Sequence, residues 1–420
     1  MENTQAEIGL LRFTTAGSVD DGKSTLIGRL LYDSKSIFED QMEHITESSK
    51  RRGKEEVDLA LLTDGLRAER EQGITIDVAY RYFSTPKRKF IIADTPGHIQ
   101  YTRNMVTGAS TADVAVILID ARAGVIEQTT RHSFIASLLN MKHTIFCVNK
   151  MDLVDYSEET FNKIKKDIEI LASKVGAKNI HIIPISAKLG DNVVDNTPNL
   201  AWFKGSTFLD LLETVKIADT DILANARFPV QTVIRPQTKD FPDYRGYGGR
   251  VAGGTFTYGE EVTILPSMRT SKIKSLDKFE EKLNEAKSGD CISICLEDEI
   301  DISRGDMIVP SSNIPTITKE LDVMLCWFNE KAMMLRGKYI LRTSSREVKC
   351  MITVINNKIN INTLEEDTED KKIEMNDISN IKLKCTQPIF VDSYKTNSVT
   401  GSLILINEAT NETVAAGMVI

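Results

Sequence analysis

The sequence predicts an α/β domain, with a mostly parallel sheet and helices on both faces, followed by two all-β barrel domains. From about residue 10 to 215, apolar runs alternate with amphipathic segments, which is the pattern of strands joined by crossover helices. After about residue 225 the runs become short and alternating, with frequent glycine, as in small closed barrels. A second all-β segment begins near Thr316. We therefore expect domains at 1–225, 226–313 and 314–420.

Length and charge limit the class of protein. A chain of 420 residues exceeds one ordinary core, and its charged fraction of 27% is that of a globular protein. The net charge of -8 disfavours a protein whose main surface binds nucleic acid. No apolar run approaches the roughly 20 residues that are needed to span a bilayer. The N-terminus lacks the basic start and apolar core of a secretion signal. We expect a cytoplasmic protein with no nucleic-acid and no membrane partner.

The six cysteines are scattered, which indicates reduced thiols. Cys291 and Cys295 are the one close pair, and their spacing places both on the same side of an alternating strand. No histidine lies close to them in the sequence, so small core residues are favoured over a metal site.

A glycine-rich loop follows the first predicted strand, 10–16, and precedes a predicted helix, 25–31. It has two glycines separated by four residues, then Lys and Ser, the pattern that cradles a nucleoside triphosphate. Backbone N–H groups and the helix N-terminus attract phosphate, Lys23 adds a point charge, and Ser24 offers a hydroxyl to Mg²⁺. The predicted nucleotide-binding residues here are Gly17, Ser18, Val19, Asp20, Asp21, Gly22, Lys23, Ser24 and Thr25.

Four further strands are predicted at 90–93, 114–119, 144–148 and 180–185, and each ends in polar residues. In an open α/β sheet, ligands lie beyond the carboxyl ends of the strands, so these endings should converge. Asp94 ends the first of the four and can hold Mg²⁺ through its water shell. Gly97 then allows a backbone N–H to approach a γ-phosphate. Alone this turn is common, but after a phosphate loop it completes the phosphate site.

Two other strand ends predict a guanine site. Asp152 can accept two hydrogen bonds from the N1 and N2 donors of guanine, a donor pair that adenine lacks. Lys150 can lay its stem along the base, and Asn149 can brace the phosphate loop. Ser186, Ala187 and Lys188 follow the last strand, where their backbone N–H groups would approach the base carbonyl. The expected ligands are therefore GTP and Mg²⁺.

A charged segment, 67–77, lies between the phosphate loop and Asp94. It has a helix stop at Gly73, which by itself indicates only a helix end. Thr75 could complete Mg²⁺ coordination while a γ-phosphate is present, so the predicted metal ligands are Ser24, Thr75 and Asp94. A segment of this kind orders and releases with the state of the nucleotide.

The barrel half contains one acidic stretch, 364–372, which is predicted to be a solvated loop. Strands are expected at 228–234 and 401–406, and an alternating glycine-rich run at 246–254.

These motifs resemble the translational GTPases, the class of the elongation factors. The resemblance rests on Gly17–Ser24, Gly73–Ile76, Asp94–His98, Asn149–Asp152 and Ser186–Lys188. It implies that His98 positions the attacking water and that Val19 and Ile74 form an apolar gate. It also implies catalytic contributions from Lys23 and Thr75, and a monovalent cation near Asp20.

Within that class the chain is similar to the GTPase subunit of bacterial sulfate adenylyltransferase. The similarity is carried by 18–31, 73–81, 100–105 and 407–418, and thus spans nearly the whole chain. It departs from the family at Ile99, where a glutamate is usual, and in an expanded loop at 239–246.

The resemblance implies a division of labour. A separate small subunit would bind ATP and sulfate and form adenylyl sulfate and pyrophosphate. This chain would hydrolyse GTP to drive that reaction in a hetero-oligomer. The sequence itself contains one nucleotide site and no second site for ATP. The alternatives are a translation factor that binds tRNA and a regulatory GTP switch.

Overall fold

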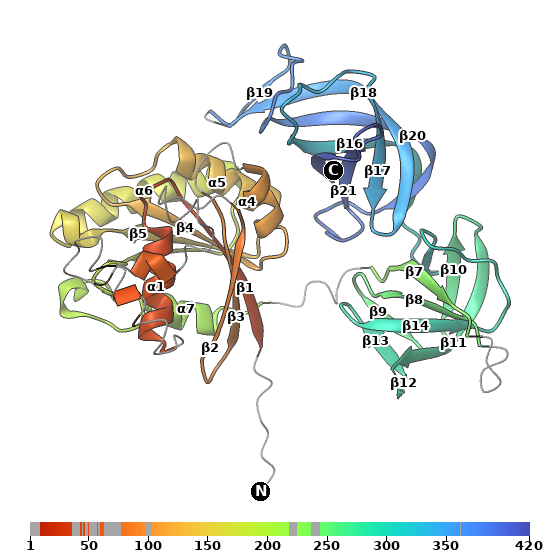
Figure 1. The fold of residues 1–420 in the computed structure, drawn as a ribbon, viewed down its shortest axis with the longest axis horizontal. Coiled ribbons are helices and arrows are strands. Elements are labelled where there is room, and N and C mark those ends of the chain that lie inside the picture. The colour runs from red at the N-terminus through yellow and green to blue at the C-terminus, as the bar shows by residue number, and fades with distance from the viewer. Residues whose placement is uncertain are drawn as a thin grey trace, which may run out of the picture. The chain divides into compact units, whose positions relative to one another are not determined.

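The computed structural model describes residues 9–35, 43, 45–46, 49, 57, 59–62, 77–96, 102–217, 225–236, 244–279, 281–361 and 363–420. The chain divides into two compact units. The first is Met1–Ile217 with Ile361–Leu364, and the second is Ala218–Asn360 with Glu365–Ile420. Figure 1 shows the fold of each unit.

The first unit is built on a six-stranded sheet in the order β2-β3-β1-β4-β5-β6. Strands β3, β1, β4, β5 and β6 are parallel, and β2 pairs antiparallel with β3 at the edge. This confirms the predicted, mostly parallel sheet. The strands are β1 Leu10–Ala16, β2 Ala79–Ser84, β3 Lys89–Asp94, β4 Val114–Asp120, β5 His143–Asn149 and β6 Ile180–Pro184.

Helices cover both faces of this sheet (Figure 1). One face packs against α1 and α7 through a core that includes Phe13, Leu30 and Phe208. On the other face, Ala115 of β4 packs with Ala109 and Ala136, which belong to α4 and α5. Every residue of β4 is buried, because a strand covered on both sides has no solvent face. The helices are α1 Lys23–Asp33, α4 Thr102–Ala109, α5 Glu127–Leu138, α6 Glu158–Val175 and α7 Phe208–Thr214, with 3-10 turns η1 Leu59–Leu62, η3 Met151–Val154 and η4 Pro198–Leu200.

Local sequence sets the bounds of α6. The Ser157 hydroxyl accepts a hydrogen bond from the Thr160 N–H at 3.2 Å, which satisfies a donor at the start of the helix. Gly176 ends the helix in a left-handed conformation, with a φ of 70°. Among the residues that the structure describes, none of the helices is long and apolar enough to cross a membrane.

The second unit contains two closed barrels, each with its own core. In the first barrel, β10, β15, β7, β8, β14 and β11 pair in that order, and β10 also pairs with β11 to close the ring. Its core includes Phe228, Tyr247 and Phe256. The strands are β7 Phe228–Ile234, β8 Gly246–Arg250, β9 Thr255–Thr257, β10 Glu261–Leu265, β11 Arg269–Lys278, β12 Glu281–Leu283, β13 Glu285–Lys287, β14 Cys291–Leu296 and β15 Met307–Pro310.

The second barrel closes through β17, β21, β22, β16, β20 and β18, because β17 pairs with both β21 and β18. Its core includes Leu325, Trp327 and Leu341. Both predicted barrels are therefore present. The strands are β16 Thr316–Trp327, β17 Lys338–Thr343, β18 Arg346–Asn360, β19 Glu365–Asp367, β20 Ile378–Val391, β21 Ser402–Asn407 and β22 Thr413–Val419.

A buried arginine fastens the two barrels to each other. The Arg227 guanidinium donates to both carboxylate oxygens of Asp392, at 2.9 and 3.0 Å, and to the Asn313 carbonyl at 2.7 Å. Asp392 also accepts from the Thr400 hydroxyl at 2.6 Å. Arg227 comes just before the first strand of the first barrel, and Asp392 follows β20 of the second, so this network orients one barrel on the other.

Two predicted elements differ from the structure. The acidic stretch 364–372 was expected to be a loop, but 365–367 form β19, which pairs with 358–360 of β18. All three residues of β19 are exposed, so their charges stay hydrated, and Lys358 forms an ion pair with Asp370 at 3.1 Å. In the run 246–254 the strand ends at Arg250, and Gly253 and Gly254 further on adopt positive φ angles of 80° and 64°, which are not those of a strand.

All six cysteines are free thiols, as expected for reduced cysteines. Cys295 is a buried residue as predicted, but Cys291 is exposed, so the prediction of a core position is wrong for Cys291, which is the first residue of β14. No group of three or more potential metal-ligating side chains occurs among the described residues.

We expect Arg227→Met to destabilise the second unit by about 3–5 kcal/mol, because Asp392 would be left as a buried charge without its partner. Arg227 and Asp392 are 1% and 8% exposed. The matched control is Arg342→Met, whose ion pair with Glu347 is 49% exposed on both sides. That change should cost less than about 1 kcal/mol. Urea unfolding followed by circular dichroism would measure both, and equal costs would contradict the prediction.

Candidate nucleotide-binding site

The polar strand endings meet at one edge of the sheet. Thr15 of β1 lies opposite Asp94 of β3, and Asp120 of β4 lies opposite Asn149 of β5. Because these strands are parallel, their carboxyl ends lie side by side, as the sequence predicts.

The loop between β1 and α1 is tightly folded. Gly22 has a φ of 93°, and a Cβ atom there would lie 2.5 Å from the Asn149 Nδ2 atom. The Asp21 carboxylate accepts a hydrogen bond from the Ser18 N–H at 2.5 Å, which closes the turn. Burial raises the pKa of Asp21, although this hydrogen bond and the charge of Lys23 oppose the rise. Gly22 therefore allows the loop to pass close under Asn149.

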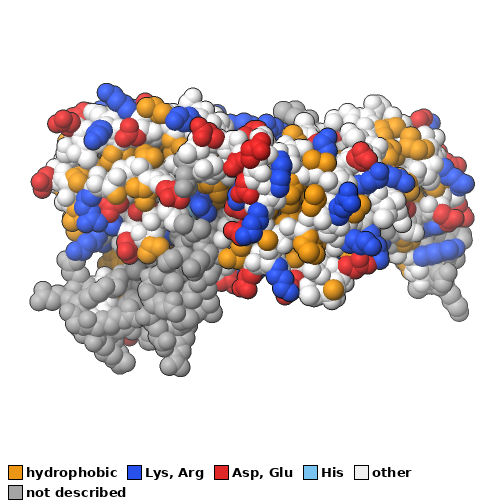
Figure 2. All heavy atoms as spheres, turned by 90° about the horizontal axis from the view of Figure 1, so that it is seen from above, with side chains coloured by type: hydrophobic (Ala, Val, Ile, Leu, Met, Phe, Trp, Pro, Cys, Tyr) orange, Lys and Arg blue, Asp and Glu red, His pale blue; other side chains and the backbone are white. Residues whose placement is uncertain are grey.

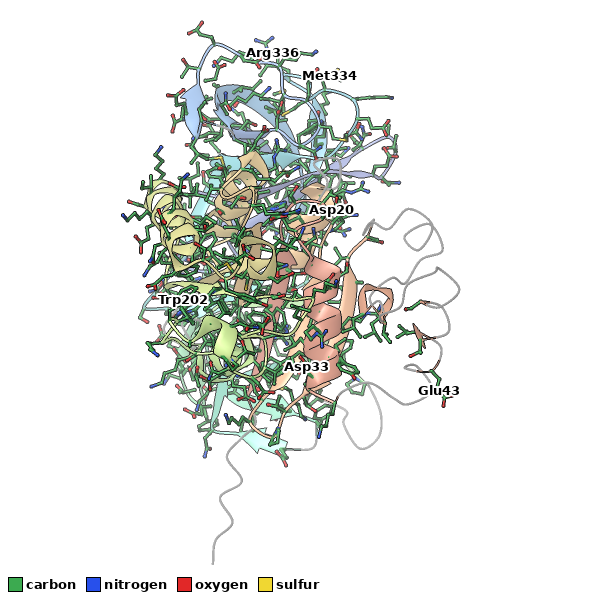
Figure 3. All side chains as sticks on the ribbon, turned by 90° about the vertical axis from the view of Figure 1, so that its left-hand side faces the viewer. Asp20, Asp33, Glu43, Trp202, Met334 and Arg336 are labelled. Atoms are coloured by element: carbon green, nitrogen blue, oxygen red, sulfur yellow. The ribbon has the colours of Figure 1, made fainter. Side chains whose placement is uncertain are left out.

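Lys23 lies at the centre of this loop and is 7% exposed. Its ammonium donates to the carbonyls of Gly17 and Ser18, both at 2.9 Å. Burial lowers the pKa of Lys23, and the nearby charge of Asp94 acts in the opposite direction. The loop thus encloses a positive charge at the N-terminus of α1. Figure 3 labels Asp20, which is exposed beside this end of α1, and Asp33 at the other end.

Asp94 is 1% exposed at the end of β3. Its Oδ1 atom accepts a hydrogen bond from the Thr15 hydroxyl at 2.9 Å. The Thr95 hydroxyl donates to the Thr15 carbonyl at 2.5 Å, which ties the end of β3 to β1. Asp94 therefore lies within electrostatic reach of Lys23 at the phosphate end of the site.

Asn149 joins the two halves of the site. Its Nδ2 group donates to the Asp21 carbonyl of the phosphate loop at 2.7 Å. Its Oδ1 atom accepts from the Ala187 N–H at 2.9 Å, in the loop that follows β6. This is the bracing contact that the sequence predicts for Asn149.

Asp152 and Ser186 are also joined. The Ser186 hydroxyl donates to the Asp152 carboxylate at 2.7 Å and accepts from the Leu189 N–H at 3.3 Å. Ser186 and Ala187 are buried, and Lys188 is exposed. The turn that carries Asp152 and the loop 186–188 therefore form one wall of the site.

Sequence reasoning missed several groups around this wall. Arg29 of α1 donates to the carbonyls of Ala187 and Lys188, which ties the phosphate-loop helix to the wall. Tyr156 donates to Asp191 across the same wall. Arg29 lies in the stretch 18–31 that carries the family similarity, but nothing in the sequence indicated this contact, and Tyr156 lies outside the motifs.

Lys150 has a further partner at the end of β4. Its ammonium lies 2.9 Å from the Asp120 Oδ2 atom, and the Arg122 guanidinium pairs with both oxygens of the same carboxylate. Burial alone would raise the pKa of Asp120, but the hydrogen bonds from Arg122 and Lys150 outweigh it and hold that pKa below its ordinary value. In the sequence, this contact was indicated only by the polar residues that follow the predicted strand 114–119.

Some predicted residues lie outside the described part of the chain. They are Thr75, Gly97 and His98, together with Ile74 and Ile99.

His132 of α5 is a buried histidine near Lys23 that the sequence did not single out. It is 3% exposed, and its Nδ1 atom has no hydrogen-bond partner among the described residues. Burial lowers the pKa of His132 to about 3, and the positive charges of Lys23 and Arg131 add to the effect. His132 is therefore neutral at neutral pH.

The fold and site define a class of protein. Residues 9–220 match the family described as the elongation factor Tu GTP binding domain, and residues 320–420 match the GTP-eEF1A C-terminal domain-like family. The first unit thus carries a GTP-binding domain of the elongation factor Tu class, as the motifs predict.

Comparison with curated relatives identifies the family of this chain within that class. Sulfate adenylyltransferase subunit 1 of Alteromonas mediterranea is 52% identical over 98% of this chain and 87% of that protein. The Sulfurovum protein of the same name is 51% identical over 98% of this chain and 87% of its own length. The bifunctional enzyme CysN/CysC of Mycobacterium tuberculosis is 50% identical over 98% of this chain and 67% of that protein. The chain belongs to the sulfate adenylyltransferase subunit 1 family, and the predicted resemblance is confirmed.

We expect Gly22→Ala to abolish tight nucleotide binding, because the methyl group would collide with Asn149 and the loop would have to move. Gly176→Ala is the matched control. Gly176 also has a positive φ, of 70°, but a Cβ atom there meets nothing closer than 3.9 Å. Both changes cost backbone strain, of about 1 kcal/mol. Titration with a fluorescent guanine nucleotide should show a loss for Gly22→Ala only; equal losses would contradict the assignment.

The pKa of His132 predicts an acid-sensitive fold. In the unfolded chain this histidine titrates near 6.5, whereas in the folded protein it titrates at about 3. Between these values the unfolded state binds a proton that the folded state does not, so the free energy of unfolding falls as the pH falls. His132→Leu should flatten this dependence by up to about 1.4 kcal/mol per pH unit. Urea unfolding at pH 7, 6 and 5 measures it, and parallel curves for the two proteins would contradict it.

Proposed function

We propose that this chain binds and hydrolyses GTP at the carboxyl ends of β1, β3, β4 and β5. It would thereby drive the formation of adenylyl sulfate and pyrophosphate from ATP and sulfate on a separate small subunit. The observation that carries the proposal is the bridge made by Asn149, which holds a phosphate-loop fold and a guanine-type wall in one site. Membership in the sulfate adenylyltransferase subunit 1 family supports the reaction that is driven.

The phosphate end would be held by the loop 17–25. Its backbone N–H groups and the start of α1 favour anionic oxygens, and Lys23 supplies a fixed positive charge that is already desolvated. Two carbonyls of the loop accept hydrogen bonds from the Lys23 ammonium, so the position of this charge is fixed although the side chain is long. The loop would therefore be preorganised for the β- and γ-phosphates.

The base end would be read by Asp152, with Lys150 along the base and Ala187 and Lys188 near the base carbonyl. Ser186 fixes one oxygen of the Asp152 carboxylate by its hydrogen bond of 2.7 Å. A carboxylate held in this way accepts two donors from guanine, and adenine would leave it unpaired. Selectivity for guanine follows from that difference.

The residues at the phosphate end fit Mg²⁺, which prefers hard oxygen ligands. The Ser24 hydroxyl and the buried Asp94 carboxylate are oxygen donors near the charge of Lys23, and Thr75 would complete the set. When bound, the ion would neutralise charge on the phosphate oxygens.

Hydrolysis is assigned to the segments around Thr75 and His98. His98 would position the attacking water, Gly97 would present its N–H to the γ-phosphate, and Val19 with Ile74 would gate His98. We also propose the three domains 1–225, 226–313 and 314–420. They are supported by the separate hydrophobic cores of the sheet and of the two barrels.

The partner would be a small ATP-binding subunit in a cytoplasmic hetero-oligomer. Energetic coupling requires that the GTP and GDP forms differ in affinity for that subunit or for its reaction states. No second nucleotide motif occurs in this sequence, so ATP chemistry is assigned to the partner.

The surface charge of the second unit supports this proposal over RNA delivery. Two exposed lysines on β20 are paired with carboxylates of β16 across the sheet, Lys382 with Asp322 at 3.5 Å and Lys384 with Glu320 at 3.3 Å. On the face shown in Figure 2, basic and acidic side chains are interspersed. Paired lysines attract phosphate less than a contiguous basic surface does.

The test is to co-express the chain with its small subunit and to measure pyrophosphate release from ATP and sulfate, with and without GTP. The proposal predicts that GTP hydrolysis moves the end point of the reaction toward adenylyl sulfate. A faster rate with an unchanged end point would indicate a regulatory switch instead. Hydrolysis stimulated by ribosomes, or co-purification of tRNA, would indicate a translation factor.

We expect Asp152→Asn to shift base selectivity from GTP toward XTP, because xanthine replaces the exocyclic amine of guanine with a carbonyl that an amide can donate to. The matched control is Asp155→Asn in the same turn, where the residue is exposed and has a φ of 51° that asparagine tolerates. Competition of GTP and XTP against a labelled nucleotide measures the ratio. An unchanged ratio in Asp152→Asn would remove Asp152 from the base site.

A further inference from the structure

We propose that Asp120 is a positioning residue of the base site. Its single carboxylate fixes the ammonium of Lys150 and the guanidinium of Arg122 beside the wall that carries Asp152. The inference rests on the proposed binding of guanine nucleotides and adds to it a residue outside the nucleotide-binding motifs.

Four hydrogen bonds fix the orientation of the Asp120 carboxylate. Asp120 is the last residue of β4, and its side chain is 9% exposed. Its Oδ1 atom accepts from the Arg122 backbone N–H at 2.9 Å and from Arg122 Nε at 3.1 Å. Its Oδ2 atom accepts from Arg122 Nη2 at 2.6 Å and from Lys150 Nζ at 2.9 Å. Each oxygen thus has two donors, so the carboxylate is held in one orientation.

This carboxylate decides where the Lys150 side chain runs. The Lys150 backbone is fixed in a left-handed conformation, with a φ of 64°, immediately before the turn that carries Asp152. Holding the ammonium at Asp120 fixes the other end, so the methylene stem is stretched between β5 and β4. A stem restrained at both ends can present a flat apolar surface to a base without losing further rotamer entropy on binding.

A competing acceptor makes Asp120 necessary. The carboxylate of Asp21 in the phosphate loop lies within electrostatic reach of Lys150. Without the charge of Asp120, the Lys150 ammonium would be drawn toward Asp21 or into solvent. Either movement would take the stem out of its place beside Asp152.

Asp120 also fixes the guanidinium of Arg122. The side chain of Arg122 is 54% exposed. The hydrogen bond to Asp120 and the charges of Asp120 and Asp152 raise the pKa of its guanidinium. Asp120 therefore also holds a cation near Asp152.

The test is Asp120→Asn in the full chain, titrated with fluorescent GDP and with a fluorescent non-hydrolysable GTP analogue. The variant keeps the shape of the side chain and removes its charge. We expect the Kd to rise about tenfold, the size of one hydrogen bond to a charged group. The rise should be equal for the two nucleotides, because the defect is at the base. Asp113→Asn is the matched control: it lies just before the opposite end of β4, where it forms an ion pair with Lys142 at 3.6 Å. Its Kd should be unchanged.

A double-variant cycle separates positioning from a general loss of structure. If Asp120 acts through Lys150, then Asp120→Asn in a Lys150→Met background should add little further loss of affinity. Independent, additive losses would overturn the proposal. So would an Asp120→Asn variant with a lower unfolding midpoint and an unchanged Kd per folded molecule, because the role would then be structural. Failure of the wild-type chain to bind any guanine nucleotide would instead overturn the proposed function.

Discussion

The two hydrogen bonds of the Asn149 carboxamide set the distance between the phosphate loop and the base wall. The side chain is 2% exposed, donates to the Asp21 carbonyl at 2.7 Å and accepts from the Ala187 N–H at 2.9 Å. A buried amide that loses one of these partners costs about 1–3 kcal/mol, so its orientation is strongly preferred. The absence of a side chain at Gly22 follows from this constraint, since any Cβ atom there would enter the space of the carboxamide. The contacts of Arg29 of α1 with the carbonyls of Ala187 and Lys188 reinforce the same spacing.

The sequence was sufficient for the elements whose signals are local. The strand predicted at 228–234 has those bounds in the structure. Its largely apolar run is preceded by an arginine and is followed by an arginine and a proline, which mark its two ends in the sequence. The parallel sheet could be predicted from apolar runs joined by helical segments, and the meeting of Asp94 and Asn149 at one edge follows from that topology alone. The bracing contact of Asn149 was likewise predictable, because it depends on strand order and not on fine geometry.

What the sequence could not predict depends on register between distant segments. Arg29 reaches the carbonyls of Ala187 and Lys188 across more than 150 residues, and arginines on exposed helix faces look alike in a sequence. The acidic residues 365–367 form a strand because Lys358 and its neighbours on β18 lie opposite them, whereas composition indicated only a loop. His132 carries no motif, and its significance comes from burial near Lys23.

The site concentrates buried charge, and this has an energetic consequence. Lys23, Asp21 and Asp94 are each no more than 7% exposed, and removing such groups from water costs several kcal/mol unless partners replace the solvent. Carbonyls of the loop hold the Lys23 ammonium, a backbone N–H donates to Asp21, and the Thr15 hydroxyl donates to Asp94. Burial lowers the pKa of the Lys23 ammonium, and the charges of Asp94 and Asp21 act on it together with these contacts and oppose that lowering. Asp120 has two donors on each oxygen, all of them from the protein itself, which is what a group needs in order to hold its neighbours in place.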